Sequence, residues 1–334
     1  MQSRSIGEQS VLLGSTIIPT IGRPTLSRAV TSMLDQGCAD DWELIVVNDS
    51  GRLLPKADWQ GQEHVRVLET DRRERSVARN AGAALARGRH LHFLDDDDWL
   101  LPGALNRFRD LCRNSTAGWL YSGSRLVDSA GTTLVELHHD LSGNCFIQVM
   151  AGEWIPLQAS LISSAAFFAC GGFNPLAPPA EDIDLCRRIL FHHNVEGIRD
   201  VTACIERGPG STTDHRRSLV LSRAAREMIL EDPDALARMR ASAHSSYWRG
   251  RIVRCCLTSG VWNLQHRKLL LALSRCQTGL WETALAHRHI LASDFWHAVL
   301  HAHQSETFAR GFRELPPCQA DLAPPPGPTA RNSS

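Results

Sequence analysis

Four consecutive aspartates, Asp95 to Asp98, are the residues of this 334-residue sequence with the clearest chemical potential. Adjacent carboxylates repel one another, and a divalent cation would remove that repulsion. Mg²⁺ and Mn²⁺ prefer hard oxygen ligands and commonly bind one or two carboxylates together with substrate phosphates. The structural alternative is an acidic cap on the following helix. The apolar run before Asp95 and Trp99-Leu100-Leu101 after Asp98 fix the turn between buried elements, which favours the metal site.

Three further positions could serve the same chemistry. Asp49 follows an apolar run and could accept hydrogen bonds from ribose hydroxyls or a base N–H, or it could form an Asx turn. Arg79 could pair with phosphate oxygens or lie on a helix surface. Glu181 or Asp182 could take a proton from an attacking hydroxyl, or cap the helix that follows. Taken singly, each position is explained at least as well by structure as by function.

The elements that must position these residues alternate between strand and helix signals. We expect strands at 15–18, ending at Pro19, and at 43–47, 65–68 and 90–94, with helices at 26–34, 77–85 and 105–112. Ser76 is the expected N-cap of the second helix. Such alternation predicts an α/β fold with a largely parallel sheet, which binds ligands at the carboxyl ends of its strands. Asp49 and the four aspartates fall at such ends.

The rest of the chain completes this sheet and then becomes helical. We expect strands at 119–121, 125–127, 132–137, 159–162 and 201–205, and helices before Gly171 and at 182–191. The predicted organisation is a catalytic unit at 1–217, with a donor half at about 11–115 and an acceptor half at about 116–217. A helical region follows at 218–315. Residues 316–334, rich in Pro and small polar residues, are expected to be a disordered tail.

Composition narrows the class of protein. The 36 basic and 36 acidic residues balance, which argues against a nucleic-acid binder. Ten cysteines without CxxC spacing indicate reduced thiols, and the N-terminus lacks a secretory signal pattern, so we expect a cytoplasmic protein. The helical region either packs on the catalytic unit or lies against the inner face of a membrane. Arg267-Lys268 before the apolar run Leu269 to Leu273 motivates the second reading.

Several short motifs follow one another in a recognisable order. They are Pro19-Thr20-Ile21-Gly22-Arg23, Val46-Val47-Asn48-Asp49, Ala78-Arg79-Asn80-Ala81-Gly82, Phe93-Leu94-Asp95-Asp96-Asp97-Asp98, Gly171-Gly172-Phe173 and Glu181-Asp182-Ile183-Asp184-Leu185. Over roughly residues 11–215 the chain resembles the family 2 glycosyltransferases, which have the GT-A fold. Two departures stand out. Asn48 precedes Asp49 where many members have two acids. A charged stretch replaces the usual Gly-rich one, which leaves open whether Arg72, Arg73 or Arg75 meets a diphosphate.

The resemblance implies a role for each matching residue. The donor nucleotide would be held by Pro19, Thr20, Gly22, Arg23, Asp49, Arg79, Asp95 and Asp96. Asp97 and Asp95 would bind Mn²⁺ or Mg²⁺, with His215 as a further ligand from a loop. Asp182 would be the general base, with Glu181 as the second candidate.

The implied reaction is a single inverting displacement. A sugar would move from a nucleoside diphosphate, UDP being the commonest in the family, to a glycan or lipid-linked acceptor. Bacterial surface glycan synthesis is the implied setting. A sugar nucleotidyltransferase is the rival enzyme, but Pro19 to Pro24 matches its Gly-rich basic loop poorly. A non-catalytic nucleotide-binding scaffold is the alternative of another class. A glycoside hydrolase would need two carboxylates but no metal-binding turn.

Overall fold

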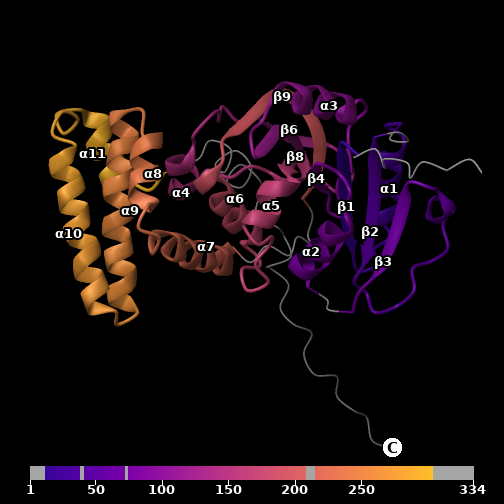
Figure 1. Cartoon of the computed structure of the whole chain (residues 1–334), viewed down its shortest axis with the longest axis horizontal. Coiled ribbons are helices and arrows are strands. Elements are labelled where there is room, and N and C mark those ends of the chain that lie inside the picture. The colour runs from indigo at the N-terminus through magenta and orange to yellow at the C-terminus, as the bar shows by residue number, and fades with distance from the viewer. Residues whose placement is uncertain (1–11, 38–40, 72–73, 208–214, 304–334) are drawn as a thin grey trace, which may run out of the picture.

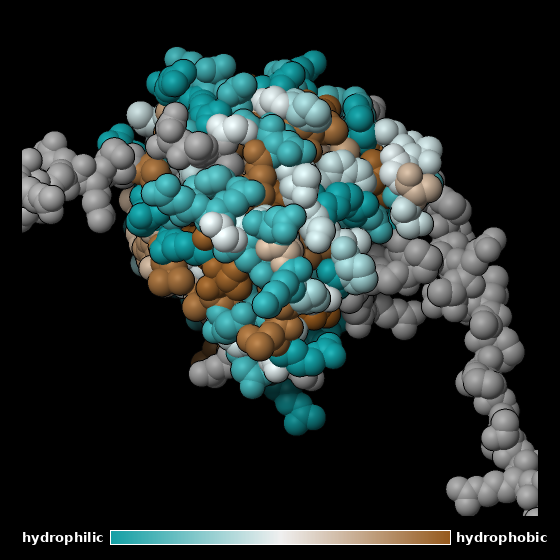
Figure 2. Space-filling view, turned by 90° about the vertical axis from the view of Figure 1, so that its right-hand side faces the viewer, coloured by the Kyte–Doolittle hydropathy of each residue, from teal (hydrophilic) through white to brown (hydrophobic). Residues whose placement is uncertain are grey.

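The computed structural model describes residues 12–37, 41–71, 74–207 and 215–303, apart from the side chains of residues 215 and 216. Within these ranges a nine-stranded sheet forms the centre of the molecule, with helices on both of its faces. A helical bundle lies at one end (Figure 1). The end that carries α1 and β3 presents mostly hydrophilic side chains, among which hydrophobic ones are scattered (Figure 2).

The first half of the chain forms the parallel part of the sheet. Its strands are ordered β3-β2-β1-β4, and all three pairings are parallel, as the alternating pattern predicts. The first strand continues through Pro19 to Thr20, beyond its expected end, and pairs with β2 along its whole length. The elements are β1 (Gly14–Thr20), α1 (Leu26–Leu34), β2 (Trp42–Asn48), η1 (Asp58–Gly61), β3 (Val65–Glu69), α2 (Arg75–Leu85), β4 (His90–Phe93), β5 (Trp99–Leu100) and α3 (Ala104–Asn114).

The second half extends the same sheet with mixed directions. The order continues β4-β8-β6-β9-β5, with β8 antiparallel to both of its neighbours. The two strands expected at 119–121 and 125–127 are one strand, β6, and the helix α4 is an element that the sequence patterns did not predict. The elements are β6 (Trp119–Val127), β7 (Thr133–Leu137), α4 (Phe146–Ala151), η2 (Leu157–Ala159), β8 (Ser160–Ser163), α5 (Ser164–Ala169), α6 (Glu181–His192) and β9 (Val195–Glu206).

Consecutive apolar residues in the central strands contribute to two hydrophobic cores, one on each face of the sheet. Ile17, Ile45 and Val47 face the cluster that α2, α4, α5 and α6 cover. Ile18 and Val46 face the opposite cluster, which α1 and α3 cover. Successive strand residues point to opposite faces, so a buried sheet needs apolar residues at every position of its inner strands. The sheet is therefore held rigidly between two helical layers, and its strand ends are fixed platforms for side chains.

The helical region packs directly on this unit. It consists of α7 (His215–Leu230), α8 (Ala235–Ser242), α9 (Ser246–Gln265), α10 (Leu269–Leu285) and α11 (Ser293–Leu300). Leu230, Met239 and Ile252 belong to the same hydrophobic cluster as the sheet residues. The predicted division at residue 217 stays a prediction, and the expected tail at 316–334 lies outside the described residues. Among the described helices, none is long and apolar enough to cross a membrane.

Candidate active site

A cavity of about 830 Å³ opens where β1 and β4 end. Residues that follow these two strands form one wall, α6 forms the floor, and α7 and α9 form the far side. The cavity therefore lies at the carboxyl ends of parallel strands, where α/β sheets bind ligands. It brings together residues that lie more than two hundred positions apart in the sequence, from Arg23 to His303.

The four aspartates form a tight turn after β4. The main-chain N–H of Asp98 donates to the carbonyl of Asp95 at 3.1 Å, which closes the turn. Carboxylate oxygens of Asp95, Asp97 and Asp98 all lie within 4.8 Å of one another, and these three residues line the cavity. Three carboxylates at this spacing can hold a divalent cation. Asp98 is an addition to the predicted ligands, and the i to i+3 geometry of a tight turn is the signal that could have indicated it.

Burial and repulsion between carboxylates of the turn raise the pKa of Asp97 and Asp98. Burial, and then the charges of Asp95 and Asp97, raise the pKa of Asp98 well above its usual value. Burial and the charge of Asp95 likewise raise the pKa of Asp97. Arg23 opposes this effect, because its Nη1 donates to Asp97 at 2.5 Å. A bound cation would relieve the same repulsion, so this donor set fits Mg²⁺ or Mn²⁺.

Asp96 points away from this group and toward the loop after β1. Its carboxylate accepts hydrogen bonds from the Thr20 hydroxyl at 2.6 Å and from Arg23 at 3.2 Å. Burial raises the pKa of Asp96 to about 6, although both partners favour its charged form. Gly22 has a φ of +83°, a left-handed conformation that suits glycine, and its N–H donates to the Thr20 hydroxyl. Thr20, Gly22 and Arg23 therefore form a loop held against the acidic turn.

Arg79 links the acidic turn to α6. It is 3% exposed, and it donates to Asp95 at 2.5 Å and to Glu181 at 3.0 Å. Burial opposes ionisation of Asp95, but the Arg79 guanidinium outweighs it and lowers the pKa of that carboxyl. The helix can approach closely because it carries Gly82, whose added Cβ would lie 2.5 Å from Ile17. Arg79 is thus a buried, charge-paired residue that also lines the cavity, rather than a surface residue.

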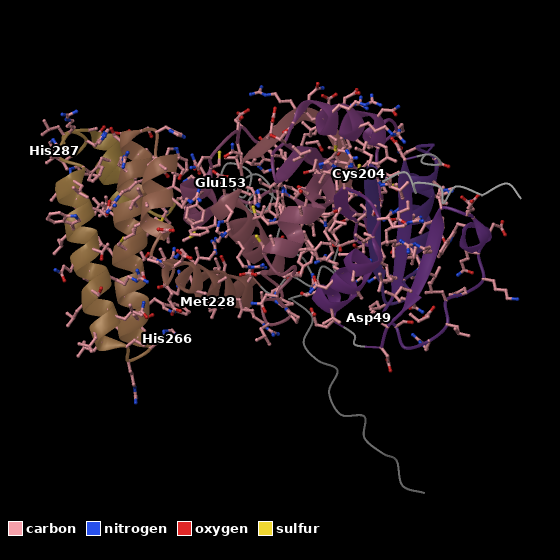
Figure 3. All side chains as sticks on the ribbon, viewed as in Figure 1. Asp49, Glu153, Cys204, Met228, His266 and His287 are labelled. Atoms are coloured by element: carbon pink, nitrogen blue, oxygen red, sulfur yellow. The ribbon has the colours of Figure 1, made fainter. Side chains whose placement is uncertain are left out.

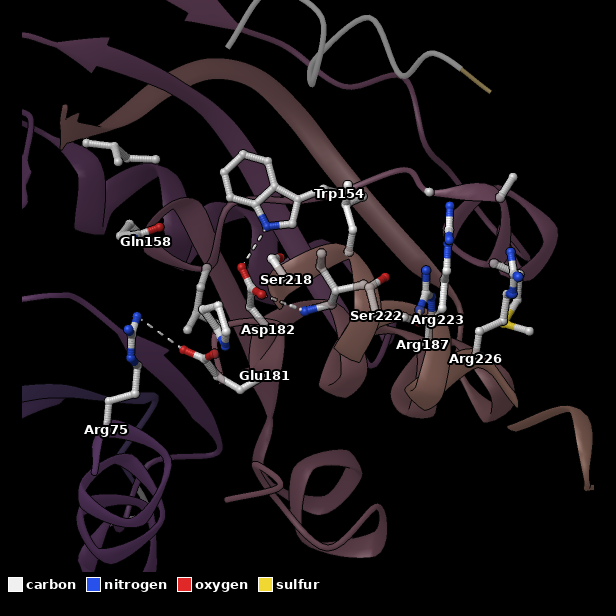
Figure 4. Close-up of a pocket in the computed structure, with 18 of the residues that line it drawn as sticks. Arg75, Trp154, Gln158, Glu181, Asp182, Arg187, Ser218, Ser222, Arg223 and Arg226 are labelled. Atoms are coloured by element: carbon white, nitrogen blue, oxygen red, sulfur yellow. Dashed lines mark hydrogen bonds and ion pairs between the residues drawn. The ribbon is translucent and has the colours of Figure 1, made fainter. Parts of the chain in front are cut away.

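The two acids at the start of α6 occupy different environments. Glu181 is 3% exposed and accepts from Arg79, with Arg75 also 3.5 Å away. Asp182 instead accepts a hydrogen bond from the indole N–H of Trp154 at 2.7 Å (Figure 4). Burial, and then the charge of Glu181, raise the pKa of Asp182. A carboxylate with a raised pKa on a cavity wall is suited to accept a proton.

The remaining predicted residues lie apart from the cavity or outside the described side chains. Asp49 is 3% exposed and does not line the cavity, and its oxygens accept from the Thr70 hydroxyl and the Glu74 N–H, both at 2.7 Å (Figure 3). Pro19 lies within β1, next to the loop that carries Arg23. The side chain of His215 is not among the described ones. Arg75 lines the cavity, whereas Arg72 and Arg73 fall outside the described residues.

Sequence comparison finds a family match in the first half of the chain. Residues 15–142 match the family model described as Glycosyl transferase family 2. The chain contains a family 2 glycosyltransferase domain. An uncharacterized glycosyltransferase of Haemophilus influenzae is 22% identical over 180 residues, which span 53% of this chain and 61% of that protein. This chain therefore aligns with about three fifths of that relative. The four motifs between Pro19 and Asp98, including the acidic turn, belong to the family-matched segment, whereas Gly171-Gly172-Phe173, Glu181 and Asp182 lie beyond it.

Solved structures support the fold of this chain over most of its length. The crystal structure of S. aureus TarS residues 1–349 gives a TM-score of 0.55 at 12% identity, and the match covers 83% of this chain and 92% of that one. The complex of the same protein with UDP-GlcNAc gives a TM-score of 0.57 at the same identity and coverage. At this identity the likeness shows the fold, which is the GT-A-like α/β architecture expected from the sequence.

Proposed function

We propose that this glycosyltransferase moves a sugar from a nucleoside diphosphate, UDP in our proposal, to an acceptor hydroxyl with inversion at the anomeric carbon. The observation that carries the proposal is that the acidic turn and Asp182 line one cavity. UDP is supported by the fold likeness to TarS, whose structures include complexes with UDP-GlcNAc and UDP. A glycan or lipid-linked acceptor and a place in bacterial surface glycan synthesis stay predictions.

The residues divide the chemistry between them. A divalent cation held by Asp95, Asp97 and Asp98 would neutralise the charge that develops on the departing diphosphate. Asp182 accepts the proton of the acceptor hydroxyl. The hydroxyl oxygen bonds to the anomeric carbon, and the bond between that carbon and the diphosphate oxygen breaks on the opposite face. Arg79 holds Asp95 and Glu181 in place, so it positions both ends of the site.

Glu181 serves a positioning role in this proposal. Its carboxylate is committed to Arg79 and Arg75, and it lies beside Asp182 at the start of α6. Its negative charge is a cause of the raised pKa of Asp182. Both acids line the cavity, but Asp182 is the better candidate for the base, because its partner is the neutral indole of Trp154 rather than an arginine.

Calorimetry with a panel of nucleoside diphosphates tests the donor site. We expect one diphosphate, UDP, to bind with Mn²⁺ or Mg²⁺ present and at least tenfold more weakly in a chelator. Asp97→Ala should remove this binding, because it deletes one of three candidate ligands. Asp110→Ala is the matched control, since Asp110 is an exposed aspartate on α3.

The result also separates the alternatives. Binding of a diphosphate that neither metal nor Asp97→Ala affects would favour a scaffold that binds nucleotides without transferring sugar. Release of pyrophosphate from a nucleoside triphosphate and a sugar phosphate would favour the nucleotidyltransferase.

Peripheral membrane contact is a separate prediction, supported by exposed apolar side chains on α10, and vesicle sedimentation of the full chain tests it. Those side chains are Leu269, Leu270, Leu273, Leu280, Trp281 and Leu285.

A further inference from the structure

The part of the cavity formed by the helical region is lined by arginines. α7 contributes Arg223 and Arg226, and α9 contributes Arg251 and Arg254, each pair three residues apart and so on one helix face. Arg187 of α6 joins them. Among the described lining residues of α7 and α9 there is no carboxylate. We call these five residues the arginine cluster.

Part of the arginine cluster lies to one side of the proposed base, Asp182, in the same cavity (Figure 4). Figure 4 shows Arg187, Arg223 and Arg226 on one side of Asp182, and Arg75 with Glu181 on the other. All of them line the same continuous cavity. A molecule that presents a hydroxyl to Asp182 from the helical side would therefore place its neighbouring groups among the guanidiniums.

Among the described residues, hydrogen bonds leave most of this positive charge without a negatively charged partner. Arg187 donates to the main-chain carbonyls of Val149 and Ser222 at 3.0 and 2.6 Å. Arg251 and Arg254 donate through Nη1 to main-chain carbonyls at the end of α11, at 2.8 to 3.1 Å. Carbonyl oxygens satisfy N–H groups and interact with a helix C-terminus, but they carry no full negative charge.

Among the described ion pairs, the one that involves the arginine cluster joins Arg226 to Glu227. Nη2 of Arg226 lies 3.8 Å from Oε1 of Glu227, and it also donates to the Thr258 hydroxyl at 3.3 Å. The other carboxylate oxygen of Glu227 is already shared by Ser259 and Asn263. Within the described part of the chain, one long ion pair is therefore set against the positive charge of five guanidiniums.

Burial and the crowding of like charges lower the pKa of members of the arginine cluster. Burial, and then the charge of Arg226, lower the pKa of Arg187 to about 10. Burial and Arg226 also lower the pKa of Arg254. These guanidiniums stay charged at neutral pH, so the fold holds them together against their repulsion. A bound anion would offset both the repulsion and the lost hydration.

We propose that the arginine cluster binds a phosphate group carried by the acceptor, while the acceptor hydroxyl meets Asp182. The planar guanidinium matches phosphate oxygens with two parallel hydrogen bonds, and several converging cations suit a group that carries up to two negative charges. Thr258 and Trp262, on the same face of α9, add a hydroxyl and an aromatic surface to the lining. The part of this proposal that concerns Asp182 rests on the proposed function, and the phosphate site does not.

Binding of inorganic phosphate to the full chain, measured by calorimetry in a chelator at constant ionic strength, tests the site. The chelator removes metal-mediated binding at the acidic turn. We expect wild-type protein to bind phosphate, and Arg226→Gln to weaken it on the order of tenfold or more, since a hydrogen bond between charged groups is lost. Arg223→Gln should also weaken it, and Arg223 is exposed, so this second variant carries little folding risk. Arg113→Gln, an exposed arginine on α3, should leave the affinity unchanged.

The same variants separate this proposal from the proposed function. Arg226→Gln should keep metal-dependent nucleoside diphosphate binding, because Arg226 contacts Glu227 and Thr258 rather than the aspartates of the acidic turn. Absence of phosphate binding by wild type, or equal affinity in wild type and both variants, would overturn the phosphate site whatever the donor experiment shows. Phosphate binding that depends on Arg226, in a chain that binds no nucleoside diphosphate, would support the site and reject the donor proposal.

Two probes then identify the source of the phosphate. Displacement of inorganic phosphate by glucose 1-phosphate indicates a phosphate borne on a glycan. Sedimentation with vesicles that contain a polyprenyl phosphate, lost in Arg226→Gln, indicates a phosphate borne on a lipid. Each result supports the site and differs only in the acceptor that it selects.

Discussion

Neighbouring residues at the start of α6 show how environment separates two similar acids. Glu181 is enclosed by arginines, and Asp182 has an indole N–H as its partner. Burial, and then the negative charge of Glu181, disfavour the charged form of Asp182. Asp182 can therefore exchange a proton over a higher pH range than an exposed aspartate.

The pH dependence of turnover should report this difference. Asp182 acts only when ionised, so turnover should fall as pH drops through its raised pKa, above the value of about 4 typical of aspartate. Trp154→Phe removes the hydrogen bond that favours the ionised form, so the acidic limb should move to higher pH. Profiles of kcat against pH for both proteins measure the shift.

The control for that measurement is Asp182→Asn, which should lower kcat by about 10²- to 10⁴-fold while keeping donor affinity. Superimposable acidic limbs for wild type and Trp154→Phe would show that another group sets the limb. Retained turnover in Asp182→Asn would remove Asp182 from the role of base.

At the scale of elements, the beginning of α2 matters because this helix carries Arg79. The sequence suggests Ser76 as its N-cap, but the structure assigns the cap to Glu74, whose carboxylate accepts from the N–H groups of Ser76 and Val77 at 3.0 and 2.9 Å. The N–H of Glu74 also donates to Asp49. Ser76 is fully buried inside the first turn instead.

Substitution of the two candidates should distinguish them. Glu74→Ala should lower the free energy of unfolding by about 0.5–2 kcal/mol, since it leaves two N–H groups of the first turn without their acceptor. Ser76→Ala should change it by less than about 0.5 kcal/mol, because the Ser76 hydroxyl accepts no cap hydrogen bond and has no partner in the described structure. Urea unfolding of both variants compares them, and a larger loss for Ser76→Ala would return the cap to Ser76.

At the scale of the whole molecule, the hydrophobic cores tie the helical region to the sheet. Leu230, Ala235, Met239 and Ile252 lie in the cluster that α4 and α6 also fill. The same region supplies one wall of the cavity. Deletion of residues 218–334 would therefore expose apolar surface on α4 and α6, and it would open the site to water.

We expect a chain of residues 1–217 to lose cooperative unfolding, because it lacks these buried partners. Thermal unfolding followed by near-ultraviolet circular dichroism measures this. A sharp transition with native aromatic signals would show instead that the division predicted at residue 217 separates two units that fold independently.

The sequence could predict the features that depend on residues close together in the chain. Short apolar runs that end at turn residues indicated the central strands, and the position of Asp95 to Asp98 after one of them placed the acidic turn at a strand end. The inclusion of Asp98 depends on turn geometry, and the inward orientation of Asp49 depends on contacts with the chain after β3. The arginine cluster was not predicted, because it depends on how α6, α7 and α9 pack around one cavity.

The double role of α9 has a practical consequence. Ile252 and Cys255 of this helix lie in the main core, and Arg251 and Arg254 line the cavity. Any molecule that occupies the cavity of the folded chain alone must raise its melting temperature by mass action. A ligand at a hundred times its dissociation constant adds about 2.7 kcal/mol to the stability of the folded state. Donor and acceptor libraries can therefore be ranked by the melting temperature of the purified protein, before either reactant is known and without any assay of turnover.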